Sequence, residues 1–235
     1  MLLDVTHRVL LPELMDDPAL DPAQHIRALR GLERINRVSR SARLLWGPIR
    51  SLAREAATPV RVLDIATGGG DVPMRLWAFS RREGLPVRVD GCDRSPTAVK
   101  HARRAAARLG AEVRFFQCDA LAHALPDGYD ILVSSLFLHH LSVEQSIVLL
   151  RAMAQAAGRM VLVNDLVRDP AGLALAYAGT RLLTTSEIVH ADGPQSVRAA
   201  YTVEEVVALS QQAGLDDSRL VRRWPCRFLL IWRRR

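Results

Sequence analysis

The stretch RVLDIATGGGD, residues 61–71, decides the fold of this chain. Val62, Leu63 and Ile65 form an apolar run that ends directly at a glycine cluster. Such a run predicts a buried parallel strand that turns sharply towards a helix. Glycines suit this turn because they adopt positive φ and lack a Cβ, so a ligand can lie against the backbone. The pattern therefore indicates a nucleotide-type turn.

The residues around the glycines narrow the class of ligand. A phosphate-binding P-loop needs Lys followed by Ser or Thr after its last glycine, whereas Gly70 is followed by Asp71, Val72 and Pro73. A dinucleotide fold keeps the helix N-terminus free for a pyrophosphate, which Asp71 would repel. Asp64 and Asp71 instead suit a ligand that carries positive charge and free hydroxyls or amines. S-adenosylmethionine, with a sulfonium, an ammonium, a ribose and no phosphate, meets this description.

Residues 62–71 resemble the first motif of the class I S-adenosylmethionine-dependent methyltransferases, an acidic residue followed by GxGxG. They are especially similar to the LDxATGTGD form found in quinone-ring methyltransferases. Ala66 stands where many members carry the first glycine, and alanine occurs there in the quinone-ring form. The resemblance covers about residues 61–232. It implies S-adenosylmethionine as cofactor, S-adenosylhomocysteine as product, and cofactor contacts from Asp64, Ala66, Thr67, Gly68 and Gly70.

Strands and helices alternate beyond this turn. We expect strands at 87–93, 112–117, 129–135 and 160–164, and a closing antiparallel hairpin at 220–221 and 227–232. Helices are expected at 72–83, after Ser95-Pro96, at 144–157 with Gly158 as C-cap, and after Thr202, where Glu205 completes a capping box. Together they predict an α/β, Rossmann-like, seven-stranded and mostly parallel sheet with helices on both faces and an antiparallel last strand.

Polar residues follow several of these strands. Asp93 lies 29 residues after Asp64, where an acid can accept two hydrogen bonds from a ribose diol. The segment GCDRSPTAVKHAR around it, which includes Arg94, matches the second motif of the family. The resemblance further implies that Asp119 binds the adenine amino group and that Ala120 offers its backbone N–H to a ring nitrogen.

The predicted ligand site lies at one edge of the sheet. Ligands of such sheets bind at the carboxyl ends of the strands, near the point where the strand order reverses. Gly68, Asp93, Asp119 and Ser134 all map to that edge.

The end of the fourth strand carries the sequence SSLFLHHLS. It lacks the Asn/Asp-Pro-Pro-aromatic motif of methyltransferases that act on base amines, and it resembles enzymes that act on carbon or a phenolic oxygen of small molecules. His139 and His140 are candidate bases, since histidine titrates near neutral pH. His139 lies closer to the strand end. The alternative is a helix-start or packing role, which is common for this pair in the family.

Residues 168–201 are expected to form a substrate roof, made of an apolar helix followed by a loop. In that loop His190 and Asp192 form a candidate base with its orienting acid. The alternative is that Ser196 and Arg198 only order a surface loop.

Residues 1–57 are expected to be a helical N-terminal extension to a methyltransferase domain at 58–235. Asp21-Pro22 predicts the start of a helix that runs to about Ser39. Gly47-Pro48 predicts a break, and a short helix follows to Ala56. The extension is either a flap over one end of the sheet or a lid over cofactor and substrate.

Composition limits the other classes of function. The net charge of +7 and the pI of about 10.3 are values that favour nucleic acid as a partner. However, Lys100 is the single lysine and no aromatic residues interleave the arginines, so nucleic acid is an unexpected partner. No apolar stretch approaches the length of a membrane span, and the N-terminal residues do not resemble a secretory signal. Three cysteines without CxxC spacing favour a reducing compartment, the cytoplasm, and no metal site.

The sequence thus predicts a methyltransferase acting on oxygen or carbon of a small, hydrophobic or aromatic metabolite. A regulatory protein that binds the cofactor without catalysis and an RNA-modifying enzyme are the alternatives. The substrate and the oligomeric state stay open.

Overall fold

The computed structural model describes residues 4–17 and 19–235, so residues 1–3 and 18 of the expected extension lie outside the described residues. The strands are β1 (Val60–Ile65), β2 (Val87–Asp93), β3 (Arg114–Gln117), β4 (Tyr129–Ser135), β5 (Ala157–Leu166), β6 (Arg219–Arg223) and β7 (Arg227–Arg233). The α-helices are α1 (Pro22–Val38), α2 (Ser41–Glu55), α3 (Asp71–Glu83), α4 (Pro96–Leu109), α5 (Val143–Ala156), α6 (Pro170–Leu183), α7 (Glu187–Ala199) and α8 (Val203–Gln212). Two 3₁₀ turns are η1 (Leu14–Asp16) and η2 (Leu138–His140).

The strands form one seven-stranded sheet in the order β3-β2-β1-β4-β5-β7-β6. The first five are parallel, and β7 runs antiparallel between β5 and β6. This confirms the predicted sheet, including the antiparallel last strand and the closing hairpin. The chain steps outward from β1 to β3 and then returns to the other side of β1 as β4, so the strand order reverses between β1 and β4.

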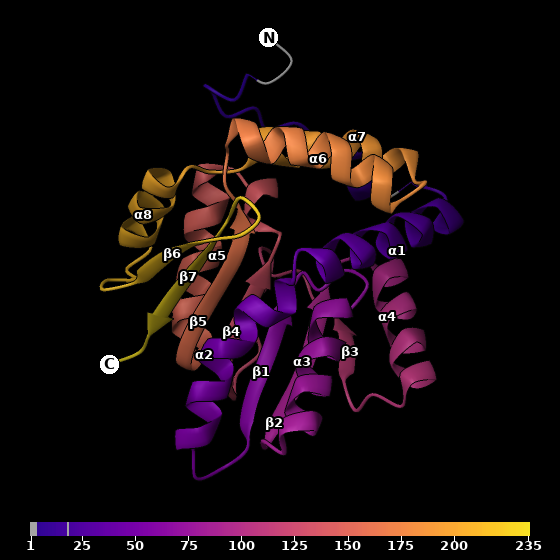
Figure 1. The fold of residues 1–235 in the computed structure, drawn as a ribbon. Coiled ribbons are helices and arrows are strands. Elements are labelled where there is room, and N and C mark those ends of the chain that lie inside the picture. Colours follow the sequence, from indigo (N-terminus) through magenta and orange to yellow (C-terminus); the bar gives the residue numbers. More distant parts are fainter. Residues whose placement is uncertain (1–3, 18) are drawn as a thin grey trace.

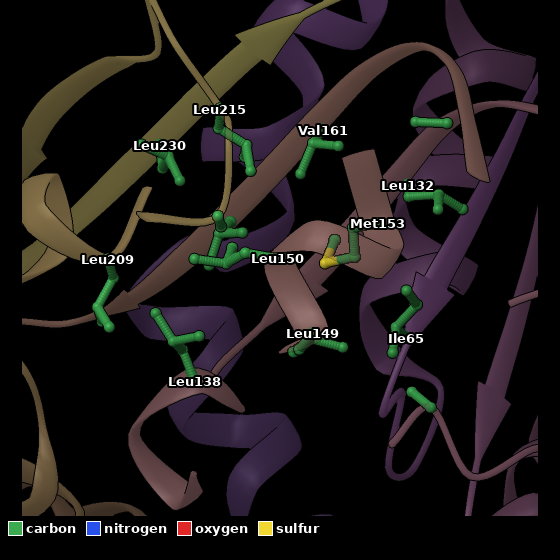
Figure 2. Close-up of a cluster of buried hydrophobic side chains, with 14 of the residues drawn as sticks. Ile65, Leu132, Leu138, Leu149, Leu150, Met153, Val161, Leu209, Leu215 and Leu230 are labelled. Carbon is green, nitrogen blue, oxygen red and sulfur yellow. The ribbon is translucent and has the colours of Figure 1, made fainter. Parts of the chain in front are cut away.

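Helices cover both faces of the sheet because successive strand residues point to opposite sides. Val62 of β1 packs with α2 and α3, whereas its neighbour Leu63 packs in the cluster that contains α5 and α8. Figure 2 shows part of this second cluster, which contains Leu149 and Met153 of α5 together with Leu132 of β4. Helix α4 packs with α3 and β3 through a smaller cluster.

Three elements lie across the carboxyl ends of the strands. Helices α6 and α7 form one layer above the sheet, and α1 runs between that layer and α4 (Figure 1). Residues 4–17, which we call the strap, run along α7: Val9 N–H donates to the Arg198 carbonyl (3.0 Å), and Asp192 accepts from the Leu14 and Met15 N–H groups (2.9 and 3.0 Å). In the described part of the chain, no helix combines the length and the apolar character that a membrane span requires.

A predicted helix break and a predicted loop do not occur, because burial of the helix faces outweighs the free-energy cost of a proline inside a helix. Helix α2 continues through Pro48, although the proline gives up one helix bond, since the face formed by Leu45, Ile49 and Leu52 is buried on the sheet. Helix α7 continues through Pro194, where a loop was expected. It packs so closely on α6 that a Cβ on Gly193 would lie 2.5 Å from Thr180 Cγ2.

The predicted cap at Gly158 is also wrong. Ala157 caps α5, and Gly158 already belongs to β5. Pairing of β5 with β4 begins at Tyr129 and Ala157, so the sheet takes up this residue. The caps expected at Asp21, Ser95 and Thr202 are confirmed.

Candidate active site

A cavity of about 740 Å³ lies at the carboxyl ends of the strands. Its floor is the glycine turn after β1 and the ends of β2 and β4, and its cover comes from α1, α6, α7 and the strap. The cavity lies where the strand order reverses, which is the edge that the sequence predicted.

The glycine turn forms one end of this cavity. Ala66 and Gly68 both have φ of +54°, so the chain curls back at the end of β1. Asp93 fixes the turn to β2, because its Oδ2 accepts from Gly68 N–H and its Oδ1 from Ser95 N–H, both at 2.8 Å. Leu29 of α1 lies over the turn, 3.6 Å from the position of a Cβ on Gly68.

The structure brings most of the predicted cofactor residues to this cavity. Those that line it are Ala66, Thr67, Gly68, Asp93, Arg94, Asp119 and Ala120. Asp119 also accepts from Leu121 N–H (3.0 Å), which closes a local turn.

Three predicted cofactor residues do not line the cavity. Gly70 faces away from it, since a Cβ there would lie 2.6 Å from Phe115 Cζ. Asp64 is buried beneath the turn, where it accepts from Thr67 Oγ1 at 2.7 Å. Ser134 is fully buried, and Ser135, the next residue of β4, lines the cavity in its place.

The glycine turn brings together buried acidic side chains, two of which have an oxygen without a hydrogen-bond partner. Burial raises the pKa of Asp64 to about 8 and that of Asp71 to about 6, and burial also raises the pKa of Asp93. One oxygen each of Asp64 and Asp71 is buried without a hydrogen-bond partner. Because buried acceptors without donors are costly, this end of the cavity suits a ligand that brings positive charge and hydrogen-bond donors.

Two histidines form the other end. His139 and His140 lie in η2 with ring centroids 4.4 Å apart. His139 Nδ1 is 2.6 Å from Asp165 Oδ1 at the end of β5, and His140 Nδ1 is 3.0 Å from Asp16 Oδ2 of the strap. The sequence predicted neither acid as a partner.

These contacts determine how the two imidazole rings are protonated. Burial opposes ionisation of Asp165, but the charge and hydrogen bond of His139 outweigh it and lower the pKa of this carboxyl group. Asp165 is therefore a carboxylate that only accepts, so His139 Nδ1 donates to it, and in the neutral ring the lone pair lies on Nε2. Burial alone would lower the pKa of His140, but Asp16 and the charges of Glu13 and Asp165 raise it to about 9. Near neutral pH His140 therefore carries a proton on both nitrogens.

Glu13 of the strap completes this end. Its Oε1 is 3.7 Å from His139 Nε2, and its Oε2 is 3.7 Å from His140 Nε2. Ser196 of α7 donates to Glu13 Oε1 at 2.5 Å. The side chains of Glu13 and His139 are 9% and 4% exposed, so this acid and this imidazole meet largely out of water.

The expected pairing of His190 with Asp192 is not formed. Both residues lie on α7, and residues two apart on a helix point in different directions. His190 Nε2 contacts the Thr184 carbonyl at 2.8 Å, whereas Asp192 binds the strap. His190 does not line the cavity.

Comparison with known proteins shows what the chain around this cavity is similar to. Residues 62–158 match the family model described as "Methyltransferase domain". Over these residues the chain is similar to methyltransferase domains. Over 116 residues it is 37% identical to the demethylmenaquinone methyltransferase of Thermus thermophilus. That alignment covers 48% of this chain and 50% of the relative, so the chain spans about half the length of the curated relative it matches.

Several solved structures are similar to this chain over most of its length. The apo S-adenosylmethionine-dependent methyltransferase SibL is similar over 98% of this chain and 64% of its own, with 22% identity and a TM-score of 0.64. Magnesium protoporphyrin IX methyltransferase from Synechocystis PCC 6803, with bound SAH, is similar over 93% and 90%, with 16% identity and a TM-score of 0.59. An O-methyltransferase family 2 protein from Planctomyces limnophilus DSM 3776, in complex with apigenin, is similar over 92% and 63%, with 18% identity and a TM-score of 0.62. These likenesses confirm the resemblance to class I S-adenosylmethionine-dependent methyltransferases at the level of the fold.

Proposed function

We propose that this protein is an S-adenosylmethionine-dependent methyltransferase that acts on an oxygen or a carbon of a small, hydrophobic or aromatic metabolite. The observation that carries the proposal is the pairing of two ends in one cavity. One end is a glycine turn fixed by Asp93, and the other is an imidazole whose Nδ1 is held by a buried carboxylate.

The residues of the turn fit the cofactor. When bound, S-adenosylmethionine supplies an electrophilic methyl group on a sulfonium ion. Asp71, which has an unpartnered oxygen, and Asp93 both line the cavity and favour a cationic ligand with donors, and Gly68 lets that ligand approach the backbone. Ala120 N–H and Asp119 are proposed to bind its adenine, and Arg94 to lie beside it.

His139 is the proposed general base. Its Nε2, the ring nitrogen that does not contact Asp165, is the proposed proton acceptor, while Asp165 fixes the ring and stabilises the imidazolium that forms when Nε2 accepts a proton. When a hydroxyl oxygen attacks the methyl carbon, its lone pair forms the new C–O bond, the S–C electrons stay on sulfur, and the hydroxyl proton moves to Nε2. His140, already protonated, is placed to position a substrate oxygen rather than to remove its proton.

The cover of the cavity supports an apolar substrate. Helices α6 and α7 contribute Leu175, Ala176 and Val197 to the lining, and Phe137 faces them from the end of β4. A volume of about 740 Å³ lies in the range of ligand pockets, about 300–1,000 Å³. The strap and α1 are proposed to act as a lid that admits both ligands and then excludes water.

The test combines binding with turnover. Calorimetric titration with S-adenosylhomocysteine should show one site per chain. Asp93→Asn should weaken this binding at least about tenfold, because a hydrogen bond between the carboxylate and the ribose diol is lost. Methyl transfer from S-adenosylmethionine to a panel of phenols and quinols should then fall by about 10²–10⁴-fold in His139→Gln. His190→Gln is the matched control, because His190 does not line the cavity, and its turnover should match wild type. No binding of S-adenosylhomocysteine to the folded wild type would refute the proposal.

A further inference from the structure

Glu13, His139 and His140 form a cluster of potential metal ligands at one end of the cavity. Two imidazole nitrogens and one carboxylate converge at the cavity end, with one ligand atom from each residue within 4.8 Å of the others. Glu13 lies about 125 residues before the histidines in the chain, so only the folded protein brings them together. We propose that Glu13, His139 and His140 bind one divalent transition-metal ion of the zinc class.

The spacing of the donor atoms is close to what such an ion needs. The two Nε2–Oε distances are each 3.7 Å. In a tetrahedral site with bonds of about 2.0–2.1 Å, neighbouring ligand atoms are about 3.4 Å apart. The two distances run to different oxygens of Glu13, and one ligand atom from each residue lies within 4.8 Å of the others, so the three side chains would draw closer together around the ion.

Both imidazoles are oriented in the way that metal-binding histidines usually are. His139 Nδ1 contacts Asp165 and His140 Nδ1 contacts Asp16, so in each ring Nδ1 is engaged and Nε2 points at Glu13. A carboxylate on the far nitrogen fixes the ring and raises its basicity as a ligand. Metal ligands must be deprotonated, so the ion takes the place of the protons that now lie among these three groups.

The donor set also selects the kind of ion. Imidazole nitrogens favour Zn²⁺, Co²⁺ or Fe²⁺, whereas Mg²⁺ and Ca²⁺ prefer sites made of oxygen. Three protein ligands leave a fourth position open, as in catalytic zinc sites. All three residues line the cavity, so that position faces the space proposed for the substrate.

The open position has a use that rests on the proposed function. A substrate hydroxyl bound to the ion there would have its pKa lowered and would release its proton to water, so the oxygen would attack the methyl carbon as an anion, with the S–C electrons staying on sulfur and no protein base required. In the metal-bound form the ion thus replaces His139 Nε2 as the group that activates the oxygen.

The test measures metal binding directly. The full chain without a histidine tag is stripped with chelator, dialysed and titrated with Co²⁺, whose visible absorption reports its ligands, and with Zn²⁺ by calorimetry. We expect one equivalent of either ion and none of Mg²⁺. Glu13→Gln and His140→Gln should each weaken binding at least about tenfold, while His25→Gln, a histidine of the same cavity outside the cluster, should not.

Circular dichroism and thermal melting show whether each variant folds, and Glu13, on the strap, keeps the test informative even where a histidine variant unfolds. Absence of a stoichiometric site in wild type overturns the inference, as does equal binding by wild type and Glu13→Gln. Titration of the metal-free protein with S-adenosylhomocysteine separates the two proposals. Cofactor binding without metal binding leaves only the methyltransferase, and metal binding without cofactor binding leaves only the metal site.

Discussion

Replacement of Gly70 by alanine should destabilise the protein through two separate effects. The residue precedes α3 with φ of +77°, a conformation that a Cβ disfavours. The added Cβ would also lie 2.6 Å from Phe115 Cζ and 2.9 Å from the Ala102 Cβ, both in the cluster between α3, α4 and β3. Neither neighbour is the end of a flexible chain, so the clash must be relieved by moving packed groups.

The magnitude follows from adding the two costs. The left-handed backbone costs an L-residue about 1 kcal/mol, and overpacking a core adds about 1–3 kcal/mol. Gly70→Ala should therefore lower the free energy of unfolding by about 2–4 kcal/mol. For a chain of this size that corresponds to a fall in Tm of about 4–16 °C.

Gly84→Ala isolates the backbone effect. Gly84 ends α3 with φ of +63°, and nothing lies within 4 Å of a Cβ built there. It should lose only about 1 kcal/mol. Urea denaturation followed by circular dichroism measures both variants. Equal losses would show that the contact between the glycine turn and Phe115 carries no energy, which would refute the packing argument.

Three further outcomes can be measured on the same protein. Gly69→Ala should keep wild-type stability, since its Cβ meets only ordinary contacts of 3.5 Å or more, yet weaken S-adenosylhomocysteine in a calorimetric titration, because Gly69 lines the cavity. Burial raises the pKa of Asp64 from 3.8 to about 8, so the contribution of Asp64 to the free energy of unfolding should be fully present below about pH 4 and lost as the pH rises to about 8. In Asp64→Asn the free energy of unfolding, measured by urea denaturation, should therefore fall less steeply over this pH range than in wild type. The same pH dependence in both proteins would contradict this prediction. Arg168→Lys should lose about 1–3 kcal/mol in the same melts, since Arg168 donates to both oxygens of Glu205 at 2.8 Å and lysine cannot; a loss near zero would show that the paired contact adds nothing.

The sheet could be predicted because its signals are local. Strands of the core are short apolar runs that end near turn residues. Each confirmed helix start depends on a capping signal that lies within four neighbouring residues, as at Asp21-Pro22 or Ser95-Pro96. Asp93 could be placed at the cavity because the end of a parallel strand determines where its last side chain lies. The helices through Pro48 and Pro194 could not be predicted, because burial against other elements outweighs the local cost of proline.

The histidine end was predicted only in part for a related reason. His139 and His140 stand beside a recognisable strand end, so their position was expected. Glu13 and Asp16 lie in a stretch without periodicity or motif, and only tertiary structure brings them to the histidines. Asp165 gave a weak signal, since it follows the fifth strand at the same edge of the sheet, and the pairing with His139 could have been inferred from that position.

The strap has a consequence for the order in which the protein matures during synthesis. Residues 4–17 are synthesised before the sheet, yet their partners on α7, among them Asp192 and Ser196, are made about 180 residues later. The contacts between the strap and α7 can therefore form only after strands β1–β5 have been translated. The sheet can begin to form meanwhile, since β1 and β2 are close neighbours in the chain. The parallel part of the sheet can thus form before the strap is fixed against α7.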